Sequence, residues 1–281
     1  MRILITGSSS GIGNAVWRHL CAEGHEVWGV ARSDPREALA RMPVASKSRA
    51  KATVCDVTDW LELCRAADEV KTAWGGLDAL ICAAGTQGAI GLAMENDVDS
   101  WVKTVQTNLT GTYLTIRCFF PLLSTSNRKA KILCFSGGGA AKARIRFSAY
   151  ACAKAGIVRL VETLSEEWKT ERVDINAVAP GAVYSRMTEE VLLRGPGEAG
   201  DDEWAQACRT RDAGPEAMAR VCGLIDYLLT EQTDGITGKL ISAQWDPWER
   251  LHEFEPDLRS SDIYCLRRIV PKDRGQRWGD R

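Results

Sequence analysis

Short apolar runs alternate along the chain with longer stretches in which apolar residues recur every three or four positions. The runs have the length of buried strands, and the stretches have the period of helices that cover a core with one face. This alternation predicts an α/β fold built on a doubly wound, mostly parallel seven-stranded sheet. The expected strands are residues 2–6, 25–31, 51–55, 77–82, 130–135, 173–178 and 238–242.

Several helices can be placed between these strands. One follows the first strand, and another begins at Asp59, which with Glu62 resembles a capping pair. A long helix begins near Asp97, an amphipathic helix occupies residues 148–168, and a further helix starts near Gly214-Pro215. Residues 33–50 are polar and basic and predict a mobile connection.

The sheet and its helices account for residues 1–243 as one domain, which leaves residues 244–281 as a C-terminal extension. Trp245, Trp248, Tyr264 and Trp278 make this extension unlike a disordered tail, which is usually poor in aromatic residues. We expect it to fold back onto its own or a neighbouring subunit. Its basic end offers Arg267 or Arg268 for an anionic group, although a packing arm with solvated charges explains the same residues.

The totals exclude several classes of function. With 36 basic and 37 acidic residues the formal net charge is -1, which predicts neither nucleic acid nor a membrane surface as a partner. No apolar run approaches the length of a membrane span, and the N-terminus has no signal peptide, so we expect a cytoplasmic protein. Ten scattered cysteines indicate reduced core residues, and three histidines without ligand spacing predict no metal.

A glycine-rich turn joins the first strand to the first helix. Gly7, Gly11 and Gly13 permit a tight turn and a close approach of the backbone to a pyrophosphate, at a helix N-terminus that favours anions. The second strand ends at Ala31-Arg32, where a dinucleotide's adenosine ribose is read. A guanidinium suits a 2′-phosphate, so NADP(H) is preferred, while Asp34 nearby keeps NAD(H) open.

Tyr150 and Lys154 are four residues apart in the amphipathic helix, so both side chains lie on one face. A free phenol has a pKa of about 10 and is a poor acid or base near neutrality. A nearby cation favours the phenolate and lowers that pKa. The pair could therefore exchange a proton with a carbinol oxygen.

Together these fragments resemble the short-chain dehydrogenase/reductase family in its compact, single-domain form, over about residues 2–243. The resemblance implies a homodimer or homotetramer, and a lid over the substrate at residues 186–213. The matching positions, in chain order, are Thr6, Gly7, Gly11, Gly13, Asp56, Ala83, Ala84, Gly85, Asn108, Ser136, Tyr150, Lys154, Pro180 and Gly181.

The resemblance also implies roles. Tyr150 would be the general acid or base, Lys154 would hold the nicotinamide ribose, and Asn108 would support a water relay to Lys154. Asp56 and Val57 would contact adenine, and Val183 would line one side of the nicotinamide site. Ser185 stands where the family usually has a threonine that reaches the nicotinamide carboxamide. The glycine turn would add Ser9, Ser10 and Ile12 to the cofactor site.

The chain departs from the family at two points. Cys82 stands where the family usually has an asparagine, so one structural hydrogen bond is missing or replaced. The family's substrate-orienting serine usually lies thirteen residues before the tyrosine, which is Gly137 here, one residue after Ser136. Either Ser136 does this work or another donor does, with Ser148 a less favoured substitute.

The sequence thus predicts an NAD(P)(H)-dependent oxidoreductase that interconverts a carbonyl and a secondary alcohol. A small polar or sugar-derived keto compound and a β-ketoacyl thioester are both open as substrates. A different class of protein, a dinucleotide-binding regulator with little turnover, is the alternative that the Gly137 position raises.

Overall fold

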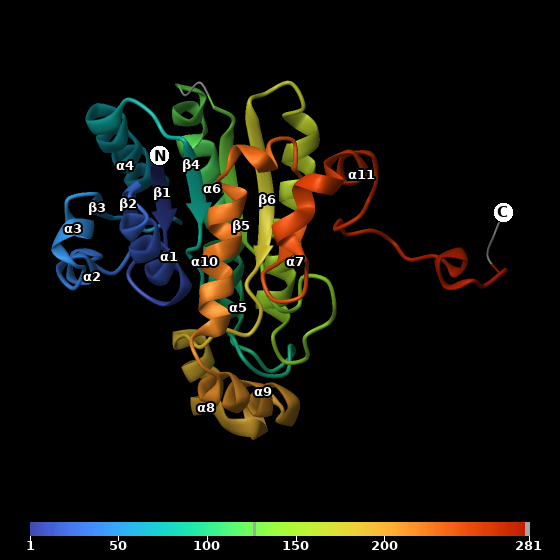
Figure 1. Cartoon of the computed structure of the whole chain (residues 1–281). Helices are drawn as coiled ribbons and strands as arrows, with labels where there is room; N and C mark the ends of the chain where they lie inside the picture. Colours follow the sequence, from blue (N-terminus) through green and yellow to red (C-terminus); the bar gives the residue numbers. More distant parts are fainter. Residues whose placement is uncertain (126–127, 279–281) are drawn as a thin grey trace.

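A computed structural model describes residues 1–125 and 128–278 of the chain (Figure 1). Seven parallel strands form one sheet in the order β3-β2-β1-β4-β5-β6-β7, which confirms the predicted doubly wound fold. The strand order reverses between β1 and β4, and the loops beyond their carboxyl ends enclose a ligand crevice in folds of this kind. The strands are β1 Arg2–Thr6, β2 Glu26–Ala31, β3 Ala50–Val54, β4 Ala79–Cys82, β5 Ala130–Phe135, β6 Val173–Ala179 and β7 Leu240–Ser242.

Helices cover both faces of the sheet because strand side chains alternate between the two faces. Ile3 and Ile5 of β1 share a core with helices α1 and α10, whereas Leu4 between them shares the opposite core with α4, α6 and α7. All three side chains are fully buried. The helices named here are α1 Gly11–Ala22, α4 Trp60–Trp74, α6 Gly111–Phe119, α7 Ser148–Glu167 and α10 Glu216–Leu228.

Aspartate caps begin two of the expected helices. The Asp59 carboxylate accepts a hydrogen bond from the Glu62 amide at 3.0 Å, and the Asp97 carboxylate accepts one from the Ser100 amide at 2.7 Å. Such caps satisfy amides that have no partner inside the helix. The helix from Asp97 runs through α5 (Val98–Val105), a π-helical turn (Gln106–Thr110) and α6, followed by a 3₁₀ turn at Phe120–Thr125.

Two segments are more regular than their composition suggests. Residues 33–50, expected as a mobile connection, contain the short helices α2 (Arg36–Ala40) and α3 (Val44–Lys47). Met42 between them is buried in the α1 core, which fixes the segment to the domain. Residues 186–213, expected as a lid, contain α8 (Arg186–Ala199) and α9 (Asp201–Asp212), which lie together at the carboxyl edge of the sheet (Figure 1).

The C-terminal extension has two parts. A 3₁₀ helix (Trp248–Phe254) and α11 (Glu255–Ser260) bury Trp248, Leu251 and Leu258 in the same core as α1 and α10. Residues 261–266 still contact the domain, since the Tyr264 carbonyl accepts a hydrogen bond from the Leu240 amide at 2.8 Å and Leu266 packs against the core that α7 shares. Beyond them the chain leaves the body of the molecule (Figure 1), with a short 3₁₀ turn at Pro271–Arg274. Residues 279–281 of the expected extension lie outside the described residues. In the described ranges, no helix combines the length and the apolar character that a membrane crossing requires.

Candidate active site

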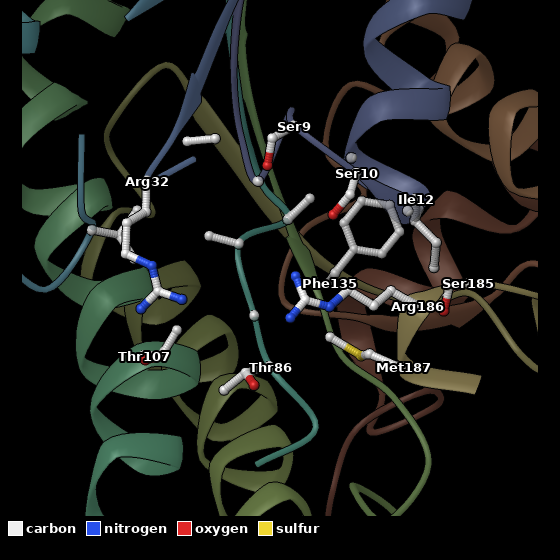
Figure 2. Close-up of a pocket in the computed structure, with 18 of the residues that line it drawn as sticks. Ser9, Ser10, Ile12, Arg32, Thr86, Thr107, Phe135, Ser185, Arg186 and Met187 are labelled. Carbon is white, nitrogen blue, oxygen red and sulfur yellow. The ribbon is translucent and has the colours of Figure 1, made fainter. Parts of the chain in front are cut away.

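A pocket opens at the carboxyl edge of the sheet, where the glycine turn, the ends of β2, β4 and β5, helix α7 and the start of α8 meet (Figure 2). Most of the residues that the sequence singled out meet in this pocket. They are Gly7, Ser9, Ser10, Gly11, Ile12, Gly13, Arg32, Asp56, Val57, Ala83, Ala84, Gly85, Ser136, Tyr150, Lys154, Pro180 and Ser185.

Three expected residues do not line the pocket: Asn108, Gly181 and Val183. Val183 is instead buried in the α1 and α10 core. The pocket also contains residues outside the predicted site, most of them next in sequence to predicted ones and others brought in by the start of α8. They are Ala31, Ser33, Cys55, Thr86, Thr107, Phe135, Arg186, Met187 and Glu190.

The glycine turn leaves no room for side chains at its closest approaches. Gly7 has φ of +73°, and a Cβ placed on Gly13 would lie only 2.4 Å from the Gly7 carbonyl oxygen. The Thr6 hydroxyl accepts hydrogen bonds from the amides of Ala83 and Ala84, at 3.2 and 3.1 Å. These contacts hold the turn, the β4 end and the first amides of α1 around one cradle, which fits a dinucleotide phosphate.

The ribose end of the pocket contains the guanidinium of Arg32 and the carboxylate of Asp56. Arg32 lines the pocket with an exposed side chain, and its Nη1 lies 3.9 Å from an Asp56 carboxylate oxygen. Asp34, which kept NAD(H) open, is paired with Arg36 at 2.7 Å and does not line the pocket. Among the two charged residues that the sequence offered here, only Arg32 is therefore in place for a phosphate.

Helix α7 brings Tyr150 and Lys154 into the pocket from one face. The Lys154 Nζ lies 5.5 Å from the centroid of the Tyr150 ring and donates a hydrogen bond to the Phe135 carbonyl at 2.8 Å. Both side chains are nearly inaccessible to solvent, at 7% exposed for Tyr150 and 4% for Lys154. Burial lowers the pKa of the Lys154 ammonium to about 8.

The sequence predicted that Lys154 lowers the pKa of Tyr150, and here the structure differs. Burial raises the pKa of Tyr150, and the cation that opposes this shift is Arg144. The Arg144 Cζ lies 5.4 Å from the Tyr150 ring centroid, and Glu203 of α9 holds its guanidinium through two hydrogen bonds at 3.0 and 2.8 Å. Lys154 instead donates a hydrogen bond to the backbone carbonyl of Phe135, which partly compensates its positive charge.

Asn108 organises the loop beside Lys154. Its amide nitrogen donates to the carbonyls of Thr86 and Thr104, at 3.0 and 2.8 Å, and its oxygen accepts from the Thr86 amide at 3.3 Å. A Cβ placed on Gly85 would lie 2.6 Å from the Asn108 Oδ1 and 3.7 Å from the Lys154 Nζ, so both side chains approach this glycine. The π-helical turn thus gives a buried asparagine three partners next to the lysine.

In the part of the chain that the structure describes, the hydroxyls of Ser136 and Ser148 form hydrogen bonds with groups other than Tyr150. Ser136 lines the pocket but is 2% exposed, and its Oγ lies 3.5 Å from the Lys154 carbonyl oxygen, to which it donates. Ser148 accepts a hydrogen bond from the Trp101 indole at 3.0 Å. Gly137 is the close neighbour, because a Cβ there would lie 2.6 Å from the Tyr150 Oη.

The basic end of the extension takes no part in this pocket. Arg267 forms ion pairs with Asp262 and Asp273, at 2.7 and 2.6 Å, and neither Arg267 nor Arg268 lines the pocket. Asp262 and Asp273 thus neutralise Arg267 within the extension itself. The described residues also contain no group of three or more potential metal ligands.

Comparison with known proteins places this geometry in a family. A sequence model of the short chain dehydrogenases matches residues 1–194. The chain belongs to the short-chain dehydrogenase family. The matched span includes the glycine turn, Tyr150 and Lys154, all of which line the pocket.

The relatives of this chain are named for different substrates, and their sequence identity to it is low. The 3-oxoacyl-(acyl-carrier-protein) reductase FabG of Thermotoga maritima is 26% identical over 240 residues, which are 85% of this chain and 94% of the relative. Two solved structures share the fold and cover 86% of this chain and 96% of theirs. They are an NAD+-bound xylitol dehydrogenase (TM-score 0.75, 23% identical) and a short chain dehydrogenase of Shigella flexneri complexed with NADP (TM-score 0.73, 21% identical).

Proposed function

We propose that this short-chain dehydrogenase is an NADP(H)-preferring enzyme that interconverts a carbonyl and a secondary alcohol. The observation that carries the proposal is the convergence of Tyr150 and Lys154 on the pocket that the glycine turn and Arg32 also line. The cradle at Gly7 and Gly13, which a Cβ would fill, fits the phosphates of such a cofactor.

In this proposal Tyr150 moves the proton. Its hydroxyl donates a proton to the carbonyl oxygen during reduction, and in the reverse reaction its phenolate oxygen takes the proton of the alcohol. Because burial raises the pKa of Tyr150, the phenol holds its proton at neutral pH, as a general acid must. The nicotinamide, when bound, supplies or accepts the hydride at the substrate carbon. Lys154 has three donors, of which one is used by Phe135, and the others would hold the nicotinamide ribose.

The cofactor preference rests on Arg32. Replacing Arg32 with glutamine is expected to weaken NADPH binding by about tenfold to a hundredfold, because hydrogen bonds to a charged group are worth about 1.5–3 kcal/mol. Binding of NADH should change little, since it has no 2′-phosphate. Titrating both dinucleotides by fluorescence measures the two dissociation constants. Equal losses for NADH and NADPH would contradict a role in reading the 2′-phosphate.

Turnover itself is tested with a panel of carbonyl substrates and NADPH. The panel should contain small polar and sugar-derived keto compounds together with β-ketoacyl thioesters, since the family includes relatives named for sugar alcohols and for 3-oxoacyl substrates. Loss of NADPH with any member supports the enzyme. Binding of NADPH without turnover of any member would favour the dinucleotide-binding regulator instead.

Gly137 offers a second test of the geometry around Tyr150. A side chain there would press on the Tyr150 hydroxyl, and a catalytic group displaced by about 1 Å can lose about a hundredfold in rate. Gly137→Ala and Gly137→Ser are therefore both expected to lower kcat, by up to about a hundredfold, although serine is the residue common in the family. Steady-state kinetics measure the effect.

Gly138→Ala is the matched control for these variants. Its added Cβ would meet nothing closer than Arg144 Cδ at 3.7 Å, an ordinary contact, so kcat should stay near that of the wild type. A Gly137→Ser enzyme faster than the wild type would show that the missing hydroxyl, and not the crowding of Tyr150, limits this site.

A further inference from the structure

Arg186 is the first residue of α8, and it stands directly beside the glycine turn. The preceding residue, Ser185, packs there, since a Cβ on Gly11 would lie 3.7 Å from the Ser185 Cβ. Figure 2 shows the Arg186 side chain reaching from α8 toward the middle of the pocket, on the side opposite Arg32. A lid residue and a cofactor turn, far apart in the sequence, thus share one wall of the pocket.

The guanidinium of Arg186 is held only loosely within its own helix. Its Nε lies 3.3 Å from the Glu190 carboxylate one turn on, and the two side chains are 74% and 36% exposed. Exposed pairs of this kind contribute little to stability, so Arg186 can exchange Glu190 for another anion at small cost. Glu190 also lines the pocket, so both members of the pair face the space that a ligand would enter.

The positions of the cationic side chains in the pocket indicate which part of a dinucleotide Arg186 would bind. Three cationic side chains line it: Arg32 at the ribose end, Lys154 on α7 and Arg186 next to the glycine turn. Lys154 is buried and donates to Phe135, and Arg32 lies at the end of β2. The amides of the turn are neutral donors, so Arg186 is the cation of the lining placed to neutralise a pyrophosphate there.

We propose that Arg186 binds the pyrophosphate of the dinucleotide, releasing Glu190 as it does so. This inference rests on the proposed function, because it requires a dinucleotide in the pocket. The planar guanidinium can give two parallel hydrogen bonds to phosphate oxygens, which a lysine ammonium cannot reproduce. Since Arg186 begins α8, the same contact fastens the start of the lid to the occupied cofactor site.

The test separates the pyrophosphate from the other parts of the cofactor by using two fragments. ADP-ribose contains the pyrophosphate without nicotinamide, and 2′-AMP contains the 2′-phosphate without a pyrophosphate. Arg186→Gln is expected to weaken ADP-ribose binding by about tenfold to a hundredfold and to leave 2′-AMP binding unchanged. Dissociation constants from calorimetry or from competition with NADPH fluorescence give this result without any turnover assay.

Arg194→Gln is the matched control, because Arg194 lies on the same helix and pairs with Glu198 at 3.0 Å across one turn but does not line the pocket. It should leave both dissociation constants unchanged. Unchanged ADP-ribose binding in Arg186→Gln, or equal weakening of both fragments, would overturn the inference and leave the proposed function standing. A wild-type protein that binds neither NADPH nor NADH would overturn both together.

Discussion

Replacing Tyr150 with phenylalanine is expected to lower kcat by about a hundredfold to ten-thousandfold, the usual contribution of a positioned general acid or base. The phenyl ring keeps the packing of a side chain that is 7% exposed but removes the only group of this residue that can carry the proton. Dinucleotide binding should persist, because the glycine turn and Arg32 are untouched. Stopped-flow or steady-state rates, together with NADPH titration, separate the two effects.

Tyr113→Phe is the matched control, since Tyr113 is 42% exposed on α6 and lies outside the pocket lining. Its kcat should equal that of the wild type. A Tyr150→Phe enzyme that retains full activity would show that another group of the pocket donates the proton, and would remove the basis of the proposed mechanism.

Replacing Lys154 with methionine is expected to change how stability depends on pH. In the folded protein burial lowers the pKa of Lys154 to about 8, whereas its ordinary value is 10.5. Between these two pH values the unfolded chain binds more protons than the folded one, so wild-type stability rises with pH. The shift corresponds to about 3 kcal/mol, gained from pH 8 to pH 10.5 and absent below pH 8.

The measurable quantity is the difference in unfolding free energy between the wild type and Lys154→Met, without cofactor. We expect the wild type to gain about 3 kcal/mol relative to the variant across that window, in urea melts at a series of pH values. Lys71→Met, which removes an exposed lysine of α4, is the control and should show a constant difference. Parallel curves for Lys154→Met would contradict the prediction, because they would mean that burial does not lower the pKa of Lys154 below its value in the unfolded chain.

The fold was predictable because its signals are local and repeated. Each strand is an apolar run bounded by turn residues, and no expected strand end differs from the observed one by more than two residues. The helices of residues 33–50 escaped notice because four or five residues show no helical period. In the segment expected as a lid, residues 186–213, Gly195 with φ of +69° and Pro196 interrupt α8 without ending it.

The site was predictable where the chemistry is carried by neighbours in sequence, and not where folding brings distant residues together. The glycine turn and the Tyr150–Lys154 spacing could be recognised directly. The approach of Arg144 to Tyr150, its pairing with Glu203 and the entry of Arg186 into the pocket depend on where the lid helices pack. Likewise, the hydrogen bonds from the Ala83 and Ala84 amides to the Thr6 hydroxyl could not be predicted from the sequence. They hold the loop after Cys82, the residue that stands in place of the asparagine expected from the family resemblance.

Because Trp248, Leu251 and Leu258 lie in the core, they limit where the C-terminus can be truncated for expression. These side chains pack in the same cluster as α1, whose first turn forms part of the cofactor cradle. Trimming the chain at residue 243, the end of the domain expected from the sequence, would open that cluster and remove packing behind the cradle. Expression boundaries and affinity tags therefore belong beyond Leu266, the last described residue of the extension that packs against a core of the domain.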